Sequence, residues 1–453
     1  MSCTRSCGEY RSGSKFGFVK LSGHTFSERI IKFSVVGGYA IVEGDIVLGS
    51  VDELDQITEG IGVVGAGKRW SNGVIPYQLD PSLVLPEQEN VELAIQHWEK
   101  ETLIRFIKHI NEKSFVTFLS REEQDPNYRG CSSRVGMVGG EQIIELSGNC
   151  GLGSTIHEIG HAVGLWHEQS RSDRDKFVEV VYANLPNDED FLEANFNQRI
   201  YDGEDLNTYD YESIMHYGAY AFAIDESKPT IIAPEPWTNR IGQREGLSKG
   251  DIAAVRSLYS INAAILHPNG KAYFFRDNLY KRFDFSSNSV DKTAQFNVDG
   301  WQGLTFDKID AAVTHPNGKG YFFRRNQFQR YDFDKASVDR TAQIGIDGWS
   351  GVWNTGIDAA INHPDGKRAF FFRGDRYQRY DFSKQKVDKE ARIADGWAGL
   401  WTNGINAAIT HPKDGKGYFF RGDQYQRYDF SLQKVDKTGS IGKDGWAGLW
   451  PRE

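Results

Sequence analysis

The pattern of hydrophobic and polar residues changes several times along the chain. The first thirty residues are polar and rich in Gly and Ser, without periodicity, and are expected to be mobile. Residues 30–50 contain short apolar runs broken by glycines, which predicts short β-strands. Residues 51–68 lack such a pattern and are typical of a flexible, cleavable linker. An apolar run then predicts a strand at 74–79, and helical spacing of apolar residues predicts a helix over 87–103.

Four similar units follow one another beyond residue 260, with a constant spacing of 48 residues. Each unit begins with Ile-Asp-Ala-Ala or Ile-Asn-Ala-Ala, at residues 261, 309, 357 and 405. His-Pro, a glycine turn and an aromatic run come next, and Asp-Gly-Trp closes the unit. Short strands around tight turns at this period are typical of propeller blades. Four copies predict a small closed propeller.

Candidate chemistry is concentrated in the segment between Thr155 and Glu168. His157 and His161 are four residues apart, so one face of a helix would present both imidazoles, with Glu158 beside them. Gly164 can take a backbone turn that other residues resist, which would bring His167 back as a third nitrogen ligand. Three neutral imidazoles and an open position are typical of catalytic zinc, where bound water ionises near neutral pH. Glu158 would take the proton of that water.

The alternative for this segment is a helix with two surface histidines and a capping box from Thr155 to Glu158. A bare His-Glu-x-x-His pattern recurs by chance. The longer pattern HExxHxxGxxH is more specific, and Ser213-Ile214-Met215-His216-Tyr217 adds an independent signal downstream. Both signals favour a zinc hydrolase.

HExxHxxGxxH followed by a methionine turn is the metzincin signature. Glu168 directly after the third histidine, and Met-His-Tyr at the turn, resemble the astacin family in particular. The resemblance covers about residues 69–259 and implies an α+β zinc endopeptidase domain. It implies that Met215 forms an apolar floor beneath the three imidazoles. It also implies that Tyr217 hydrogen-bonds the developing oxyanion.

Astacins also carry a pro-segment in which a Phe-x-Gly-Asp motif places an aspartate on the zinc and blocks the water. Val42-Glu43-Gly44-Asp45 is similar, with Val in place of Phe, although Gly-Asp is also common turn chemistry. The resemblance therefore implies that Asp45 is a zymogen latch. Cleavage at about residues 60–68 would create a new amino terminus, which the resemblance places in a buried pair with Glu168.

The chain has four cysteines. Cys131 and Cys150 flank a glycine-rich region before the zinc helix, as a disulfide does in astacins, so the resemblance implies a bridge between them. Such a bridge needs an oxidising compartment. The other disulfide of the family is absent, because Leu103 stands where a cysteine is expected. Cys3 and Cys7 could pair or bind metal, but two thiols in an unpatterned tail are more often incidental.

The four repeats resemble hemopexin-type repeats over about residues 260–453. In that family the strands that begin each repeat surround a central channel, where backbone carbonyls bind calcium or another ion. The corresponding polar positions, candidates for a Ca²⁺ or other ion site, are Asn262, Asp310, Asp358 and Asn406. The repeated histidines are interpreted as structural positions, and Arg-Gly-Asp at 373–375 and 421–423 as hairpin turns.

Composition limits the partners. A net charge of −9 argues against nucleic-acid binding, which usually needs a basic face. No apolar run approaches the roughly 20 residues needed to cross a bilayer, so no membrane span is expected. The first thirty residues lack the apolar core of a signal peptide. The expected location is nevertheless extracellular.

The sequence therefore predicts a multidomain protein with a flexible tail and pro-segment at 1–68, an astacin-like α+β catalytic domain at 69–259 and an all-β four-bladed propeller at 260–453. The predicted function is a zinc endopeptidase, made as a latent zymogen, that cleaves proteins or peptides. The propeller would bind substrate or an unknown partner. One alternative is a propeller-based binding or adhesion protein with a vestigial or permanently latent protease. Another is a zinc hydrolase whose substrate is not a peptide.

Overall fold

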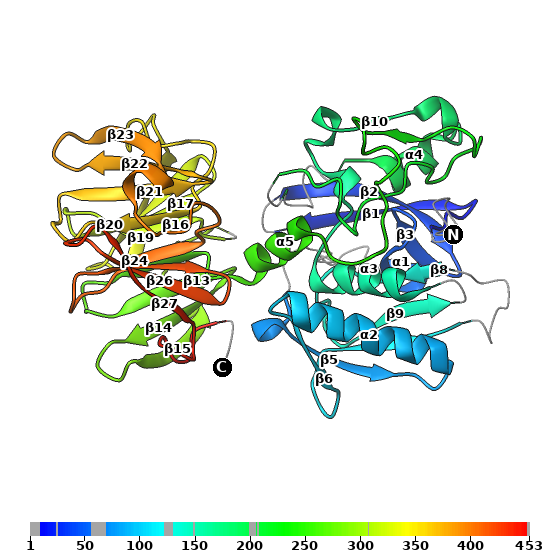
Figure 1. Cartoon of the computed structure of the whole chain (residues 1–453), viewed down its shortest axis with the longest axis horizontal. Helices are drawn as coiled ribbons and strands as arrows, with labels where there is room; N and C mark the ends of the chain where they lie inside the picture. The colour runs from blue at the N-terminus through cyan, green and yellow to red at the C-terminus, as the bar shows by residue number, and fades with distance from the viewer. Residues whose placement is uncertain are drawn as a thin grey trace. The chain divides into compact units, whose positions relative to one another are not determined.

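The computed structural model describes residues 10–23, 26–55, 69–121, 130–147, 150–198, 205, 208–306 and 308–450. The chain forms two compact units, Met1–Leu258 and Tyr259–Glu453 (Figure 1). Cys3, Cys7 and the expected cleavage region at 60–68 lie outside the described residues.

An antiparallel sheet of four strands, in the order β1-β2-β3-β4, opens the first unit. Its strands are β1 (Phe16–Gly23), β2 (Phe26–Val36), β3 (Tyr39–Val42) and β4 (Ile46–Ser50). The expectation of a mobile stretch was wrong for β1, because this strand pairs with β2 from Phe16↔Ser34 onward and buries Val19. The linker also begins later than predicted. Residues Val51–Asp55 form helix α1, where the Ser50 hydroxyl accepts from the Glu53 N–H and the Glu53 carboxylate accepts from the Ser50 N–H.

The second sheet of this unit has five strands in the order β6-β5-β7-β9-β8, with β8 antiparallel to β9 and the other pairs parallel. Its strands are β5 (Val74–Leu79), β6 (Arg105–Lys108), β7 (Phe115–Leu119), β8 (Gly130–Ser132) and β9 (Glu141–Ser147). The predicted strand at 74–79 is confirmed as β5. The predicted helix is α2 (Leu85–Glu101), which buries Val91, Ala94, Ile95 and Trp98. Trp98 Nε1 donates to the carbonyl of Ile156, 3.0 Å away, and so ties α2 to helix α3 (Leu152–Val163).

The other described residues of the first unit lie mainly in loops and short elements. These are α4 (Glu189–Phe196), α5 (Lys249–Tyr259), the pair β10 (Glu179–Val180) and β11 (Ile231–Ile232), and the 3-10 turns Ser71–Gly73, Glu168–Ser170, Arg174–Lys176 and Tyr182–Asn184. The main-chain oxygen of Ala194, in α4, accepts a hydrogen bond from the N–H of Glu43 at 3.0 Å. Helix α4 thus supports the turn between β3 and β4.

In the second unit, antiparallel four-stranded sheets recur along the repeats. Their strands are β12 (Ala263–Leu266), β13 (Ala272–Arg276), β14 (Leu279–Asp284) and β15 (Ser289–Gln295); β16 (Ala311–Thr314), β17 (Lys319–Arg324), β18 (Gln327–Asp332) and β19 (Ser337–Gln343); β20 (Ala359–Asn362), β21 (Arg368–Arg373), β22 (Arg376–Asp381) and β23 (Lys386–Arg392); and β24 (Ala407–Thr410), β25 (Gly417–Arg421), β26 (Gln424–Asp429) and β27 (Lys434–Ser440). A short helix, α6 (Ile393–Gly396), follows β23. The first strands of the sheets contact one another in the cycle β12, β16, β20, β24 and back to β12. A cavity of about 210 Å³ lies among these strands.

Neighbouring sheets share a repeated contact between a histidine and a phenylalanine ring. The pairs are His267 with Phe333, His315 with Phe382, His363 with Phe430, and His411 with Phe285, with ring centroids 4.6 to 4.9 Å apart. The last pair joins the fourth repeat to the first. The Lys281 ammonium also donates to the carbonyl of Gly448 at 2.7 Å. Side chains of the first repeat therefore bind both the fourth repeat and the segment that follows it.

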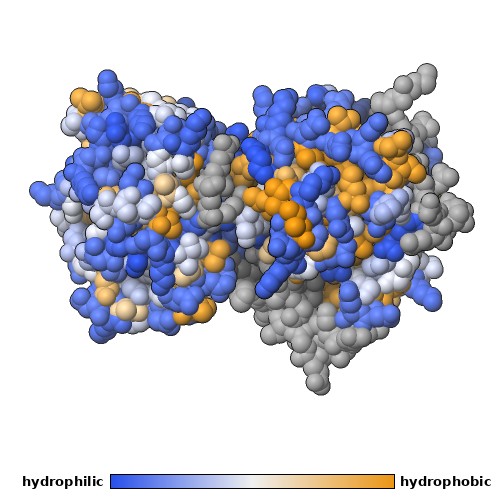
Figure 2. Space-filling model, turned by 90° about the horizontal axis from the view of Figure 1, so that it is seen from below, coloured by the Kyte–Doolittle hydropathy of each residue, from blue (hydrophilic) through white to orange (hydrophobic). Residues whose placement is uncertain are grey.

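Hydrophilic side chains cover much of the described surface on the face in Figure 2, and hydrophobic residues gather mainly over part of the first unit. Among the described residues, no helix is both long and apolar enough to cross a membrane.

Candidate metal centre

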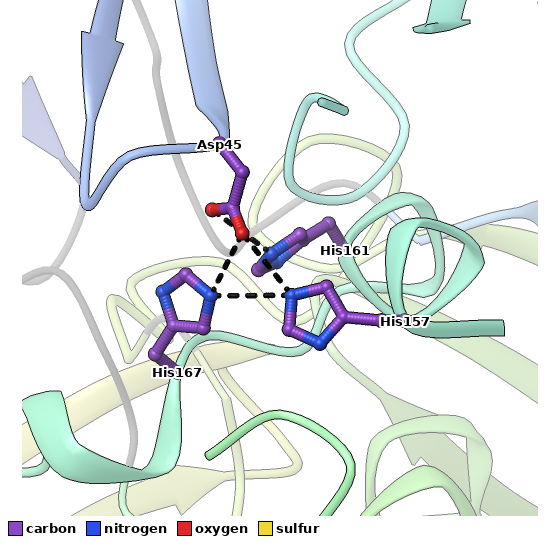
Figure 3. Close-up of side chains that lie close together, drawn as sticks. All are labelled: Asp45, His157, His161 and His167. Atoms are coloured by element: carbon purple, nitrogen blue, oxygen red, sulfur yellow. Dashed lines mark hydrogen bonds and ion pairs between the residues drawn. The ribbon is translucent and has the colours of Figure 1, made fainter. Parts of the chain in front are cut away.

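Helix α3 and the turn that ends it bring the three predicted ligands together. His157 and His161 lie one turn apart on α3, and both are fully buried. The helix ends at Gly164, whose φ of +119° is in the left-handed region, as predicted for this glycine. The chain then returns so that His167 faces the other two imidazoles. Figure 3 shows Asp45 reaching toward this cluster from the turn between β3 and β4.

Potential ligand atoms of Asp45, His157, His161 and His167 all lie within 4.8 Å of one another. The Nδ1 atom of each imidazole donates a hydrogen bond to an oxygen that is not one of these ligand atoms. His157 Nδ1 donates to the carbonyl of Ile214 at 2.7 Å, and His161 Nδ1 donates to the carbonyl of Leu165 at 2.9 Å. His167 Nδ1 donates to a carboxylate oxygen of Glu43 at 2.8 Å. The Nε2 atoms are thereby aimed at a common centre.

This centre requires a positive charge. The Nε2 atoms of His157 and His167 are 3.2 Å apart, and Asp45 Oδ2 lies 3.3 Å from each of them. Asp45 Oδ1 lies 3.5 Å from His161 Nε2. Lone pairs of nitrogen and oxygen would repel one another at these distances unless a proton or a metal ion lies between them. Three imidazoles and a carboxylate form a donor set that suits Zn²⁺.

The electrostatics lead to the same requirement. Burial lowers the pKa of His157 to about 3, so this imidazole is neutral and can act as a ligand. Burial alone would raise the pKa of Asp45, but the charge of His167 and hydrogen bonds from the imidazoles hold that pKa well below its usual value. Burial alone would lower the pKa of His167, yet Asp45 and Glu43 outweigh it and raise that pKa to about 9. A bound metal ion would replace the proton of His167.

The other predicted catalytic residues surround this cluster. Glu158 follows His157 on α3 and is fully buried. Met215 packs against the helix between the ligands, since a Cβ on Gly160 would lie 2.6 Å from its sulfur. The ring of Tyr217 lies 4.8 Å from that of His167. The Tyr217 hydroxyl donates to the main-chain oxygen of Glu43 at 2.6 Å.

Several residues around the site were not predicted from the sequence. Glu43 binds both His167 and Tyr217. Tyr10 places its ring 4.4 Å from the ring of Tyr217, and its hydroxyl accepts from an Arg244 Nη2 at 2.6 Å. These residues come from segments far apart in the chain, and no local pattern marks them. The x of the Val-x-Gly-Asp motif was the only available signal for Glu43.

Glu168 lines a cavity of about 70 Å³, together with Arg171, Asp210 and Asp251. Its Oε1 accepts from the N–H of Asp210 at 2.8 Å. Burial raises the pKa of Glu168 to about 8, and the nearby guanidinium of Arg171 opposes that shift only in part. This carboxyl would therefore ionise more readily next to an added positive charge.

The predicted disulfide between Cys131 and Cys150 is present. It joins β8 to the segment just before α3. Leu103, where the resemblance led us to expect a cysteine, is buried.

The four residues predicted to surround a channel ion bind the hairpin of their own sheet. The oxygens of Asn262, Asp310, Asp358 and Asn406 accept hydrogen bonds from the backbone N–H groups of Asp277, Arg325, Gly374 and Gly422, respectively. Arg-Gly-Asp at 373–375 forms such a hairpin turn, as expected. These side chains have a structural role, and an ion in the channel stays a prediction.

Comparison with known proteins extends these observations. The family model described as Astacin, a peptidase family, matches residues 63–260, and the model described as Hemopexin matches residues 357–402. Zinc metalloproteinase nas-4 of Caenorhabditis elegans is 32% identical over 229 residues, which are 50% of this chain and 70% of that protein. High choriolytic enzyme 1 of Oryzias latipes is 39% identical over 199 residues, which are 43% of this chain and 69% of that protein.

Tolloid-like protein 2 of Homo sapiens is 38% identical over 203 residues. The match covers 43% of this chain and 19% of that much longer protein. The similarity to such relatives is therefore confined to a single part of each.

Proposed function

The chain belongs to the astacin family of peptidases, and from this premise we propose that it is a zinc endopeptidase kept latent by its own amino-terminal segment. One observation carries the proposal. The carboxylate of Asp45 lies among the three imidazoles that the HExxHxxGxxH motif brings together. The same cluster thus accounts for a metal site and for its inhibition.

His157, His161 and His167 would hold the zinc. When bound, zinc makes a water molecule acidic and polarises the peptide carbonyl. Glu158 would take the proton of that water and later deliver it to the leaving amine. The Tyr217 hydroxyl would donate a hydrogen bond to the oxyanion of the tetrahedral intermediate, and one well-placed oxyanion donor is worth on the order of 3 kcal/mol.

Latency would follow from the turn that contains Glu43, Gly44 and Asp45. Asp45, whose Oδ2 lies 3.3 Å from His157 Nε2, would take the position that the attacking water needs, and the Glu43 carbonyl accepts from the hydroxyl of Tyr217. A single turn therefore occupies both the metal centre and the oxyanion donor. Glu43 and Asp45 are themselves buried, so water does not compete for these contacts.

The residues before β1 reinforce this turn. The N–H of Arg11 donates to the carbonyl of Gly44 at 2.9 Å. Gly44 has a φ of +80°, and a Cβ at this position would lie 2.8 Å from the Cβ of Tyr10. Residues 10–11 therefore cover Gly44 closely, and Tyr10 also covers Tyr217. Full release of the latch would require both the turn and this covering segment to leave.

We further propose a division into a pro-segment at 1–68, a catalytic domain at 69–259 and a four-bladed hemopexin-type propeller at 260–453, which binds substrate or another partner. The cyclic contacts of β12, β16, β20 and β24 support the propeller. The Cys131–Cys150 disulfide supports an oxidising, extracellular location.

Hydrolysis of a denatured protein by the purified chain tests this function. The chain is assayed before and after limited proteolysis within residues 60–68, and a Glu158→Ala variant is treated in the same way. Activity that appears after the cut and is absent from Glu158→Ala is expected. A cut protein that binds one zinc ion yet cleaves nothing would contradict the proposal.

A further inference from the structure

Both backbone polar groups of Tyr217 are held by buried side chains. Its N–H donates to Gln169 Oε1 at 3.0 Å, and its carbonyl accepts from His216 Nδ1 at 2.7 Å. His216 Nε2 accepts in turn from the hydroxyl of Tyr209 at 2.8 Å. Gln169, His216 and Tyr217 all have an exposed fraction of 0%. His216 is thus a neutral imidazole that links two protein groups.

Gln169 lies two residues after His167, so it connects Tyr217 to the loop that carries a metal ligand. The N–H of Glu168 donates to the carbonyl of Met215 at 3.0 Å, next to the bond between Gln169 and Tyr217. The backbone of Gln169 is itself fixed, because its carbonyl accepts from Arg174 Nη1 at 3.1 Å. These bonds join the segment 167–169 to the segment 215–217.

The backbone beyond Tyr217 has little room to move. Gly242, with a φ of +80°, packs so closely that a Cβ there would lie 2.3 Å from the Cα of Gly218. Arg244 Nη1 donates to the carbonyl of Ile214 at 2.9 Å, which is also the acceptor for His157. The main chain on either side of Tyr217 is therefore restrained by neighbouring loops.

Buried backbone groups need hydrogen-bond partners in any fold, so these bonds alone would fit a purely structural role. Two features favour a further role. The partners are side chains rather than a strand or helix, and one of them belongs to the loop of a metal ligand. An oxyanion donor is effective only when its position relative to the metal is fixed within a fraction of an ångström.

We propose that Gln169 and His216 are positioning residues for the reaction, which hold the Tyr217 hydroxyl at a fixed distance from the metal centre. This inference rests on the proposed function of Tyr217 as an oxyanion donor. Gln169 holds the backbone N–H of Tyr217, and His216 holds its backbone carbonyl. Both would act through Tyr217.

The test uses the full chain after cleavage within residues 60–68. Gln169→Met keeps the length of the side chain but removes the acceptor, whereas Gln169→Glu keeps an acceptor oxygen. We expect Gln169→Met to lower kcat about tenfold while KM changes less than about twofold, since the lost contact acts in the transition state. In contrast, the Gln169→Glu variant should have a kcat within about threefold of the wild-type value, because it keeps an acceptor oxygen for the Tyr217 N–H.

The same substitution in a Tyr217→Phe variant distinguishes a positioning role of Gln169 from a purely structural one. Gln169→Met is combined with Tyr217→Phe, which removes the hydroxyl itself. If Gln169 acts through Tyr217, the double variant is no slower than Tyr217→Phe alone. A further tenfold loss in that background, or an unchanged kcat for Gln169→Met in the wild-type background, would overturn the inference.

Gln426→Met is the matched control. Gln426 is also a buried glutamine, and its Oε1 accepts from the N–H of Trp401 at 2.9 Å, but it lies in the second unit. It should leave kcat unchanged. If Gln169→Met does not fold, His216→Asn, which keeps a donor, is compared with His216→Leu, and only the latter should lose kcat. An inactive wild-type enzyme after cleavage would instead contradict the proposed function.

Discussion

The hydroxyl of Tyr217 donates to the main-chain oxygen of Glu43 at 2.6 Å, although 174 residues separate the two. The side chain of the same Glu43 accepts from His167. One residue of the amino-terminal segment therefore contacts both the proposed oxyanion donor and a metal ligand. Asp45, two residues later, faces the metal centre. The latch we propose is thus a pair of carboxylates and a carbonyl rather than a single aspartate.

Tyr10 should contribute to latency. Tyr10→Ala removes both the ring against Tyr217 and the hydroxyl bonded to Arg244, so we expect the uncut chain to hydrolyse substrate several times faster than the wild type. Tyr10→Phe keeps the ring and should have a smaller effect. Tyr182→Ala, at a 53% exposed tyrosine in the same unit, is the control. Initial rates with a quenched fluorescent peptide measure the effect, and equal rates for Tyr10→Ala and wild type would refute it.

Zinc removal should depend on the state of the amino-terminal segment. Asp45 adds a fourth donor and covers the metal position in the uncut chain, so a chelator should remove zinc more slowly from it than from the cut chain. Activity of the cut chain should be lost with the zinc and return when zinc is added. The release of zinc can be followed with a colorimetric dye. Equal release rates before and after the cut would show that Asp45 does not hold the ion.

The ligand set could be predicted because its geometry is local. His157 and His161 share a helix face, and Gly164 allows the turn that returns His167, so spacing alone was enough. Glu43, Tyr10, Arg244 and Gln169 act through contacts between distant segments. No periodicity reports such contacts, and only Glu43 lies within a motif, so the roles of these residues emerged from the fold.

The same contrast holds for the fold. The repeats were visible because each unit contains the whole pattern of its sheet. Strand β1 was missed because it is stabilised by pairing with β2 rather than by its own composition. Helix α1 was missed for another reason: Ser50 and Glu53 form a capping box that the sequence does contain.

Acid should destabilise the repeat unit. Burial lowers the pKa of His267, His315, His363 and His411 from the ordinary value of 6.5. Asp365 and Asp414 oppose this shift at the last two histidines, and Arg368 and Lys413 add to it. The folded state therefore favours neutral rings, so their stabilisation is complete above pH 6.5 and is lost as the pH falls below that value.

Urea unfolding followed by tryptophan fluorescence at pH 7.5 and pH 5 measures this effect. The midpoint should be lower at pH 5, and replacing His267 and His315 by Phe should reduce the difference. A pH dependence that is unchanged in this double variant would show that other groups cause it.

Closure of the repeat unit should depend on Trp450. This side chain is 2% exposed, packs in the core cluster that contains Ile261, and lies beneath the guanidinium of Arg276 at 4.6 Å. Trp450→Ala should lower the free energy of unfolding by about 3 to 5 kcal/mol, because it leaves a large cavity. Ile346→Ala, at a 75% exposed position, is the control and should change it by less than about 0.5 kcal/mol. An equal effect of both substitutions in urea unfolding would contradict this role.

The central claim is tested most directly by the rate at which the uncut Asp45→Ala chain hydrolyses a peptide. Uncut wild type, cut wild type and uncut Asp45→Ala/Glu158→Ala are measured beside it, each with its zinc content. The account predicts that uncut Asp45→Ala, with one zinc ion, is at least about tenfold faster than uncut wild type, since the zinc-bound water is then free to form. It also predicts that the double variant is inactive. The latch would be contradicted if cut wild type were active but uncut Asp45→Ala were as slow as uncut wild type. The peptidase activity itself would be contradicted if both cut wild type and uncut Asp45→Ala were inactive.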